Sequence, residues 1–278
     1  MTHDVAGPSV ASAGSLPLDQ IICGDNCEIM RQMPSESIDL VVTSPPYDDL
    51  RTYGGHSWDF YGVAWNLKRL LKPGGVIVWV VGDKTENGCE TGTSAKQAEH
   101  FRSVGLNQHD TMIYHRQGAF PMDAARRYWQ DWEYMFVFSN GKPKTFNPIK
   151  EKSVRKAGST INRRRLVEGV IGSARVDRVA SGTKSKSNVW YIPAGSFMTK
   201  DKMAFEHPAI YPERLAGDHI ATWSNPGDVV LDPFSGSGTT AKMARETGRR
   251  FIGIEVNPEY VDISRKRLAQ QALPMDVA

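Results

Sequence analysis

The chain has 278 residues, of which 40% are hydrophobic and 23% charged, as expected for one α/β domain with an added module or for two small domains. No apolar run approaches the length of a membrane span, and no basic start with an apolar core opens the chain, so we expect neither a transmembrane helix nor a secretory signal. Cys23 and Cys27 have no second pair of Cys or His at ligand spacing, which argues against a zinc site. Three cysteines in a chain of this size fit a protein of the reducing cytosol.

The first half of the chain alternates short apolar strands with helices. Residues 1–17 are small and polar without periodicity, which predicts a disordered tail. Pro45 and Pro46 must end the strand before them, because they lack N–H donors and have a fixed φ. Strands are predicted at residues 18–23, 38–42, 76–81, 109–115 and 133–138, and helices at 27–32, 61–71 and 94–104.

The middle of the chain is strongly basic and shows no clear period. Residues 141–203 contain 15 Lys and Arg against 4 Asp and Glu, a balance of +11. Since the whole chain carries +3, the remainder carries −8. One basic segment on an otherwise acidic protein favours a polyanionic partner such as nucleic acid. The alternative is a solvated loop with scattered positive charge.

The C-terminal part returns to the alternating pattern. Strands are predicted at residues 189–192, 228–231 and 251–255, and helices at 207–223, 238–247 and 258–270. Buried strands alternating with helices predict a parallel sheet covered on both faces.

A Gly-rich turn, Asp232 to Thr240, follows the strand at 228–231. It has neither the three spaced glycines of a dinucleotide site nor the Lys of a phosphate loop. Ligands in such sheets bind at the carboxyl ends of strands, so Asp232 is placed to face a ligand ammonium group. Glu255, about 20 residues later at the next strand end, is placed to hold ribose hydroxyls. The alternatives are a plain helix entry and a solvated N-cap charge.

Ser44-Pro45-Pro46-Tyr47 follows another strand. An aromatic exocyclic amine is a poor nucleophile because its lone pair is delocalised, and donating hydrogen bonds to acceptors makes it more reactive. The Ser44 hydroxyl and the Pro45 carbonyl are suitable acceptors, and the prolines stiffen that carbonyl. Tyr47 can stack on a base that has left the duplex. The alternative is a rigid turn between strand and helix.

Together these residues resemble the amino-methyltransferases of DNA, over residues 19–271. Asp232 to Gly238 resembles the cofactor motif of that family and Thr43 to Tyr47 its catalytic motif. The catalytic motif comes first, which is the order of the permuted β group, TSPPY type. The resemblance implies a Rossmann-like, S-adenosylmethionine-dependent fold with a doubly wound, mostly parallel seven-stranded sheet. It divides the chain into a catalytic domain at 18–141 and 205–278 and a target-recognition region at 142–204.

The resemblance also implies the site residues and involves no metal. Asp25 lies in a segment that resembles the one contacting the cofactor adenine, and residues 207–215 resemble the segment beside the methionine. Arg163, Arg164 and Arg165 are interpreted as phosphate contacts or a mobile loop, and Trp190 and Tyr191 as core residues. The implied catalytic residues are Ser44, Pro45, Pro46 and Tyr47, and the implied cofactor-binding residues are Asp25, Cys27, Thr43, His207, Pro208, Asp232, Pro233, Phe234, Ser235, Gly236, Ser237, Gly238, Thr239, Glu255 and Asn257.

Two features favour cytosine N4 as the methyl acceptor: Ser44 where adenine-N6 members commonly carry Asp, and the form His-Pro-Ala at 207–209. The sequence therefore predicts a site-specific cytosine-N4 methyltransferase that flips a base out of duplex DNA. Alternatives are an adenine-N6 enzyme of the same fold, an RNA or protein-glutamine methyltransferase, and a non-catalytic DNA-binding module. We expect a monomer or homodimer without membrane contact, in the cytoplasm of a bacterium or archaeon or encoded by a phage, with a restriction endonuclease as a possible separate partner.

Overall fold

The computed structural model describes residues 15–46, 58–117, 128–167, 170–193, 199, 201, 203–204, 210 and 212–270, with the backbone alone at 160–167 and 170–178. Within these residues, no helix is long and apolar enough to cross a membrane. The chain forms two compact units, one of residues 1–146 and 189–278 and the other of residues 147–188, and each is described by itself.

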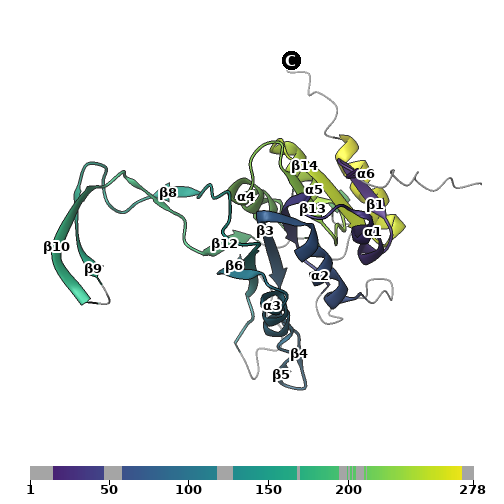
Figure 1. Ribbon diagram of the computed structural model, residues 1–278, viewed down its shortest axis with the longest axis horizontal. Helices are drawn as coiled ribbons and strands as arrows, with labels where there is room; N and C mark the ends of the chain where they lie inside the picture. Colours follow the sequence, from purple (N-terminus) through teal and green to yellow (C-terminus); the bar gives the residue numbers. More distant parts are fainter. Residues whose placement is uncertain are drawn as a thin grey trace, which may run out of the picture. The chain divides into compact units, whose positions relative to one another are not determined.

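The main unit is built on an eight-stranded sheet (Figure 1). Neighbouring strands run parallel, except that β7 is antiparallel to both of its neighbours. The sheet thus has one strand more than the seven expected, and the added strand is β12 at the edge. In spatial order the strands are β1 (Gln20–Cys23), β14 (Arg250–Glu255), β13 (Val229–Asp232), β2 (Ile38–Thr43), β3 (Leu71–Val81), β7 (Trp132–Ser139), β6 (Asn107–Gln117) and β12 (Val189–Pro193).

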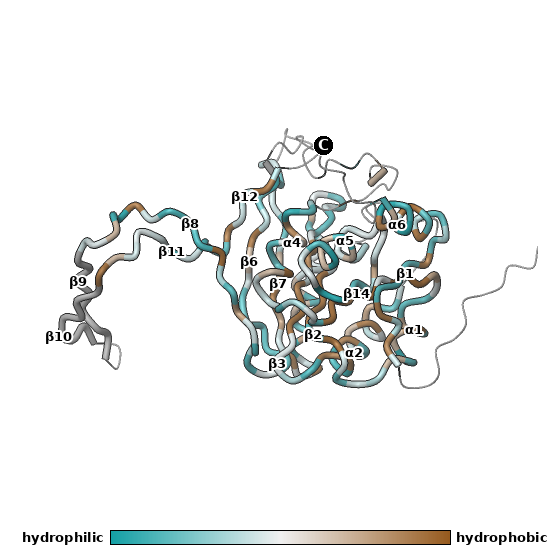
Figure 2. Tube along the Cα trace, turned by 90° about the horizontal axis from the view of Figure 1, so that it is seen from above, coloured by the Kyte–Doolittle hydropathy of each residue, from teal (hydrophilic) through white to brown (hydrophobic). Residues whose placement is uncertain are grey.

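Helices cover both faces of this sheet, which confirms the predicted doubly wound α/β fold. Figure 2 shows α1 and α2 on one side of the strands and α4, α5 and α6 on the other, and α3 packs against α2. A short hairpin of β4 (Thr85–Glu86) and β5 (Cys89–Glu90) precedes α3. The helices are α1 (Asn26–Gln32), α2 (Phe60–Leu70), α3 (Thr93–Ser103), α4 (Glu213–Trp223), α5 (Thr239–Glu246) and α6 (Pro258–Gln270).

The core lies between the central strands and these helices, where Figure 2 shows the most hydrophobic residues in brown. Val41, Ile77 and Trp79 are fully buried, and the indole Nε1 of Trp79 donates to Oε1 of Gln97 at 2.8 Å. Leu16 packs against the same core. The predicted tail of residues 1–17 therefore extends too far, and residues 1–14 lie outside the described residues.

Most predicted elements are found within one to three residues of their expected ends, but α4 begins later than predicted. The helix starts at Glu213 with Pro212 as its N-cap, instead of at residue 207. Proline as the cap fits this start, because proline has no backbone N–H to donate to the carbonyl oxygen four residues earlier, as a longer helix would require. Residues 205–209 and 211 lie outside the described residues.

The second unit consists of two antiparallel strand pairs. β8 (Lys150–Lys152) pairs with β11 (Thr183–Ser185), and β9 (Thr160–Val167) pairs with β10 (Val170–Val179). The sequence shows no strand period here, and Arg163 to Arg165 lie in β9 instead of in a loop. The unit is shorter than the predicted recognition region of 142–204.

β12 belongs to the main sheet, and its side chains alternate between its two faces. Trp190 is 4% exposed and stacks on the ring of His219 with centroids 4.4 Å apart, so the prediction of a core residue is confirmed. Tyr191 is 56% exposed, so the same prediction is wrong for it. Successive side chains of a strand point to opposite faces, which explains the difference.

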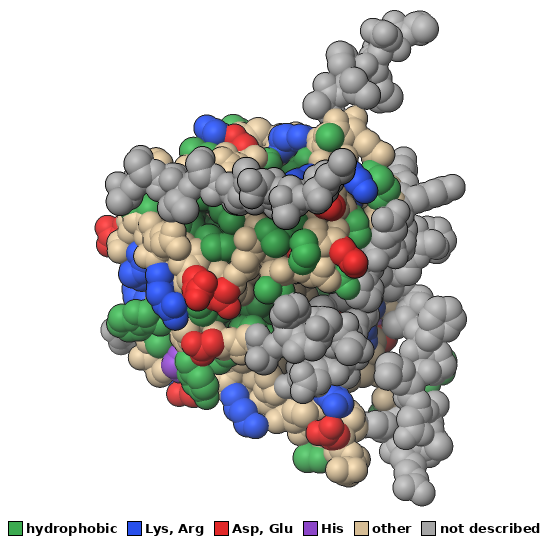
Figure 3. All heavy atoms as spheres, turned by 90° about the vertical axis from the view of Figure 1, so that its right-hand side faces the viewer, with side chains coloured by type: hydrophobic (Ala, Val, Ile, Leu, Met, Phe, Trp, Pro, Cys, Tyr) green, Lys and Arg blue, Asp and Glu red, His purple; other side chains and the backbone are tan. Residues whose placement is uncertain are grey.

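The charge on the main unit is mixed. Figure 3 shows the face that carries β1, α1 and α6, and among the side chains drawn there acidic (red), basic (blue) and apolar (green) groups are interspersed. This agrees with a chain whose positive charge is concentrated in residues 141–203.

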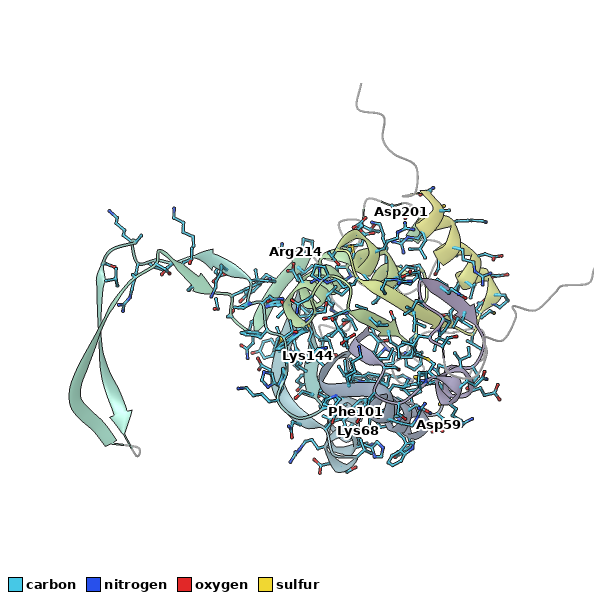
Figure 4. All side chains as sticks on the ribbon, turned by 45° about the horizontal axis from the view of Figure 1, so that its top comes forward. Asp59, Lys68, Phe101, Lys144, Asp201 and Arg214 are labelled. Atoms are coloured by element: carbon cyan, nitrogen blue, oxygen red, sulfur yellow. The ribbon has the colours of Figure 1, made fainter. Side chains whose placement is uncertain are left out.

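At the amino-terminal edge of the sheet, Asp39 of β2 is 2% exposed. Its carboxylate accepts hydrogen bonds from Lys72 Nζ at 2.7 Å, from Val229 N at 2.9 Å and from Lys144 Nζ, labelled in Figure 4. Burial alone would raise the pKa of Asp39, but hydrogen bonds from Lys144, Lys72 and Val229 outweigh it and hold the pKa below 3.8. The carboxylate therefore ties β2 to β3, to β13 and to the loop at Lys144.

We predict that Asp39→Asn lowers the free energy of unfolding at pH 7 by about 1–3 kcal/mol, because both ammonium partners lose their counter-charge. A lowered folded-state pKa contributes stability that is present above 3.8 and is lost as the pH falls through the folded value. Urea unfolding should therefore show that the free energy of unfolding differs less between Asp39→Asn and wild type at pH 3 than at pH 7. Glu99→Gln, which removes an exposed pair with Arg102, is the control and should change stability by less than about 0.5 kcal/mol. An equal loss in both variants would contradict this account.

Candidate active site

The candidate site lies where the sheet changes its direction of winding. β13 leads through α5 to β14 on one side, and β2 leads through α2 to β3 on the other. β13 and β2 are neighbours, with Val230 paired to Leu40 and Leu231 to Val41. Ligands of open α/β sheets bind at such a switch point, beyond the carboxyl ends of the strands.

Asp232 ends β13 at this point and is 1% exposed. Its Oδ1 accepts from Thr43 Oγ1 at 2.7 Å and from Phe234 N at 3.0 Å, and its Oδ2 accepts from Thr240 Oγ1 at 2.7 Å. Burial raises the pKa of Asp232 to about 6, although these three hydrogen bonds act in the opposite direction. No cation among the described residues pairs with this carboxylate, so it retains the capacity to bind one.

The backbone of the turn after Asp232 is bonded to the neighbouring strand β14. The N–H of Ser235 donates to Ile254 O at 2.9 Å, and Gly236 and Gly238 have φ values of 50° and 79°, in the left-handed region that glycine favours. The Ser235 hydroxyl oxygen is buried and has no hydrogen-bond partner in the described part of the chain. A buried hydroxyl without a partner is costly, so Ser235 fits a position that a ligand completes.

Glu255 ends β14 beside this turn. Its Oε2 accepts from Gly236 N and its Oε1 from Asn257 N, both at 2.9 Å. These two bonds fix the carboxylate of Glu255 against the turn. Asn257 in turn accepts from Glu259 N at 2.9 Å and thereby opens α6.

Asp25, Asn26 and Cys27, which follow β1, make three different kinds of contact. Asp25 caps α1, and its Oδ1 accepts from Glu28 N at 2.9 Å. Asn26 is buried, and its Nδ2 donates to Pro233 O at 3.1 Å. Cys27 is 4% exposed and part of the core, and burial, reinforced by Asp25 and Asp59, raises its pKa to about 11. The thiol of Cys27 is therefore neutral at physiological pH.

The predicted catalytic residues Ser44, Pro45 and Pro46 continue directly from Thr43 at the end of β2, with Pro45 buried and the other two half-buried. The sheet therefore brings them to the edge at which Asp232 and Glu255 end their strands. Tyr47, His207 and Pro208 lie outside the described residues.

Thr240, Asn26 and Trp58 also shape the site, and the sequence reasoning did not single them out. The ring of Trp58 meets Phe234 edge to face, with centroids 4.8 Å apart. Asn26 directly follows Asp25, but its amide hydrogen bond to Pro233 joins segments that are distant in the chain. A hydroxyl directly after the turn was the available signal for Thr240.

Comparison with known proteins identifies the family. The family model described as DNA methylase (N6_N4_Mtase) matches residues 38–266, and the chain therefore belongs to this family. The orphan methyltransferase M.BamHII of Bacillus amyloliquefaciens is 48% identical over 241 residues, which cover 84% of this chain and 89% of the relative. The DNA adenine methyltransferase YhdJ of Escherichia coli K12 is 29% identical over 266 residues, 89% of this chain and 82% of the relative.

The fold agrees with solved structures of this class. TTHA0409 from Thermus thermophilus, solved in complex with S-adenosyl-L-methionine, superposes with a TM-score of 0.61 at 26% identity, covering 91% of this chain and 93% of that one. The protein is thus a DNA methyltransferase of the N4/N6 family that uses S-adenosylmethionine. The predicted cofactor and the predicted DNA substrate are both confirmed at this level.

We predict that Asp232→Asn stabilises the protein at pH 8 while preserving its shape. A pKa raised from 3.8 to about 6 means that ionised Asp232 opposes folding by up to roughly 3 kcal/mol above pH 6. The neutral amide removes this term, and the gain should shrink as the pH falls toward 3.8, where folded and unfolded states are both protonated. Denaturant unfolding of Asp232→Asn and wild type at pH 8 and pH 4 measures this gain in the free energy of unfolding.

Asp262→Asn, at an exposed position of α6, is the control and should leave stability within about 0.5 kcal/mol. An Asp232→Asn variant that is less stable than wild type at both pH values would show that its hydrogen bonds matter more than its buried charge.

Proposed function

We propose that the protein is a β-group, TSPPY-type methyltransferase that transfers a methyl group to the exocyclic N4 of cytosine in duplex DNA. The observation that carries the proposal is Ser44 at the end of β2, one residue after the Thr43 that donates to Asp232. This position puts the acceptor-binding loop beside the cofactor turn. A serine there supplies a neutral hydroxyl, where adenine-N6 members of the resembled family commonly have a carboxylate.

The residues present fit the cofactor. Asp232 is a buried carboxylate without a cationic partner among the described residues, and it suits the methionyl ammonium. Glu255 ends the neighbouring strand β14 beside the same turn, and its carboxylate suits ribose hydroxyls as an acceptor. The Ser235 hydroxyl lacks a partner among the described residues, and the amino terminus of α5 begins at this turn, where its dipole suits the methionine carboxylate. The cofactor, when bound, supplies an electrophilic methyl group.

The residues after β2 bind and orient the target amine. The Ser44 hydroxyl and the Pro45 carbonyl accept hydrogen bonds from the target amine and thereby raise the electron density on its nitrogen. Thr43 fixes the start of this loop through its bond to Asp232 at 2.7 Å. Since methyl transfer is an in-line displacement, holding the amine and the methyl donor in line supplies much of the rate.

The second unit is proposed to bind and read the DNA, within the target-recognition region of residues 142–204. Its strands carry the basic cluster Arg163 to Arg165, which suits phosphate contacts. M.BamHII is named an orphan methyltransferase, so the proposal includes no cognate endonuclease. A second candidate is adenine-N6 methylation, which is favoured by the 29% identity to the adenine methyltransferase YhdJ.

We predict that incubation with duplex DNA and labelled S-adenosylmethionine, followed by digestion to nucleosides, yields N4-methylcytosine. N6-methyladenine as the sole product would reject the cytosine assignment and support the second candidate. Heat-denatured DNA and structured RNA of the same composition serve as controls and should be poorer acceptors.

Ser44→Ala should lower kcat by about 100-fold or more, because it removes an acceptor that acts on the amine in the transition state. The Kd for S-adenosylmethionine should stay within about twofold of wild type, since Ser44 lies on the acceptor side. Single-turnover rates and calorimetry measure the two effects. Ser103→Ala, at an exposed site on α3, is the matched control. A variant that keeps wild-type turnover would remove Ser44 from the mechanism.

A further inference from the structure

Two side chains of α6 reach the turn that follows β13. Ser264 and Arg267 lie one helical turn apart, and their exposed fractions are 0% and 1%. The Ser264 hydroxyl donates to Gly236 O at 2.6 Å. Arg267 donates through Nη1 to the carbonyl oxygen of Ser237 and, at 3.0 Å, to its hydroxyl. Consecutive carbonyl groups of the turn are thus held by one face of one helix.

The same guanidinium is held on its other sides by two carboxylates. Its Nε donates to Asp201 Oδ2 at 2.7 Å, and its Nη2 donates to Glu213 Oε1 at 3.0 Å. Glu213 also accepts from Lys242 Nζ at 2.6 Å. Lys242 Nζ also lies 3.7 Å from Glu246 Oε1. The two carboxylates that contact Arg267 balance the charge of the buried guanidinium. Asp201, labelled in Figure 4, precedes α4 in the chain, and Glu213 begins that helix.

This arrangement controls the direction of the turn's N–H groups. In a trans peptide the carbonyl and the following N–H point in opposite directions. Because Ser264 holds the Gly236 carbonyl toward α6, the N–H of Ser237 points away from the helix. Gly238 has a φ of 79°, and a Cβ at this position would lie 3.0 Å from the Ser264 side chain. The close packing of α6 therefore leaves the turn little freedom to reorient.

We propose that Ser264 and Arg267 are positioning residues that hold the cofactor turn in its binding orientation, and that Arg267 also fastens Asp201 and Glu213 against it. The inference rests on the cofactor role proposed above for this turn. Neither side chain contacts the reacting atoms, so loss of either should weaken cofactor binding without slowing the methyl transfer of the saturated enzyme.

The test compares Ser264→Ala and Arg267→Lys with wild type, with Asp232→Asn as a reference and the exposed Lys266→Met on the same helix as the matched control. Lysine keeps the charge opposite both carboxylates but lacks the planar fork that also reaches Ser237. Calorimetry with S-adenosylmethionine should give a Kd about tenfold higher for Arg267→Lys and about threefold to tenfold higher for Ser264→Ala. The KM for the cofactor should rise in parallel, while kcat at saturation and the KM for DNA stay within about twofold. Lys266→Met should match wild type.

The inference is overturned if both variants bind the cofactor within twofold of wild type, or if kcat and Tm fall while the KM for the cofactor stays constant, as a merely structural role predicts. If Arg267→Lys does not fold, Ser264→Ala alone decides, because it removes a single oxygen. Failure of this inference is distinguishable from failure of the proposed site. If Asp232→Asn weakens binding while both α6 variants bind normally, only the positioning role falls. If Asp232→Asn binds as tightly as wild type, the cofactor role of the turn falls as well.

Discussion

The hydrogen bonds that Thr43 and Thr240 donate to the buried carboxylate of Asp232 join the two halves of the sheet where their winding diverges. Thr43 and Asp232 are 189 residues apart in the chain, and their side chains meet at 2.7 Å. The Thr240 hydroxyl oxygen also lies 3.1 Å from Val42 O, so Thr240 connects α5 to both strands. The start of the proposed catalytic loop and the start of the proposed cofactor turn are therefore fixed by one carboxylate.

Two buried carboxylates hold the same pair of strands at opposite edges, and their surroundings differ in one respect. Asp39 receives Val229 N and two lysines, and its pKa is lowered. Asp232 receives only hydroxyl and backbone donors, and burial raises its pKa to about 6. Asp39 has the environment of a completed structural contact, because its charge is neutralised within the protein. Asp232 has the environment of a binding site, because a ligand such as the methionyl ammonium can supply the cation that the protein does not.

The sequence allowed prediction of the parts of the fold that depend on local pattern. Continuous apolar runs marked the buried strands, and Pro45 and Pro46 marked the end of β2 because they cannot extend a ladder. The strands of the second unit were missed since their residues do not alternate between polar and apolar. Asn26, Ser264 and Arg267 were missed for another reason. Their bonds to the cofactor turn join segments that are distant in the chain, and no local spacing reports such contacts.

The order of β2 and β13 along the chain has a structural consequence. The cofactor turn, its following strand and its supporting helix form one continuous stretch from β13 to α6 (residues 229–270), and the side chains of α6 hold the turn from within that stretch. The acceptor loop comes instead from β2, which meets the turn chiefly through Thr43. A change at Ser44 can therefore alter which amine is bound while the turn keeps its geometry. Under the proposed function, base specificity in this chain depends on the loop after Thr43 and on the second unit, not on the turn.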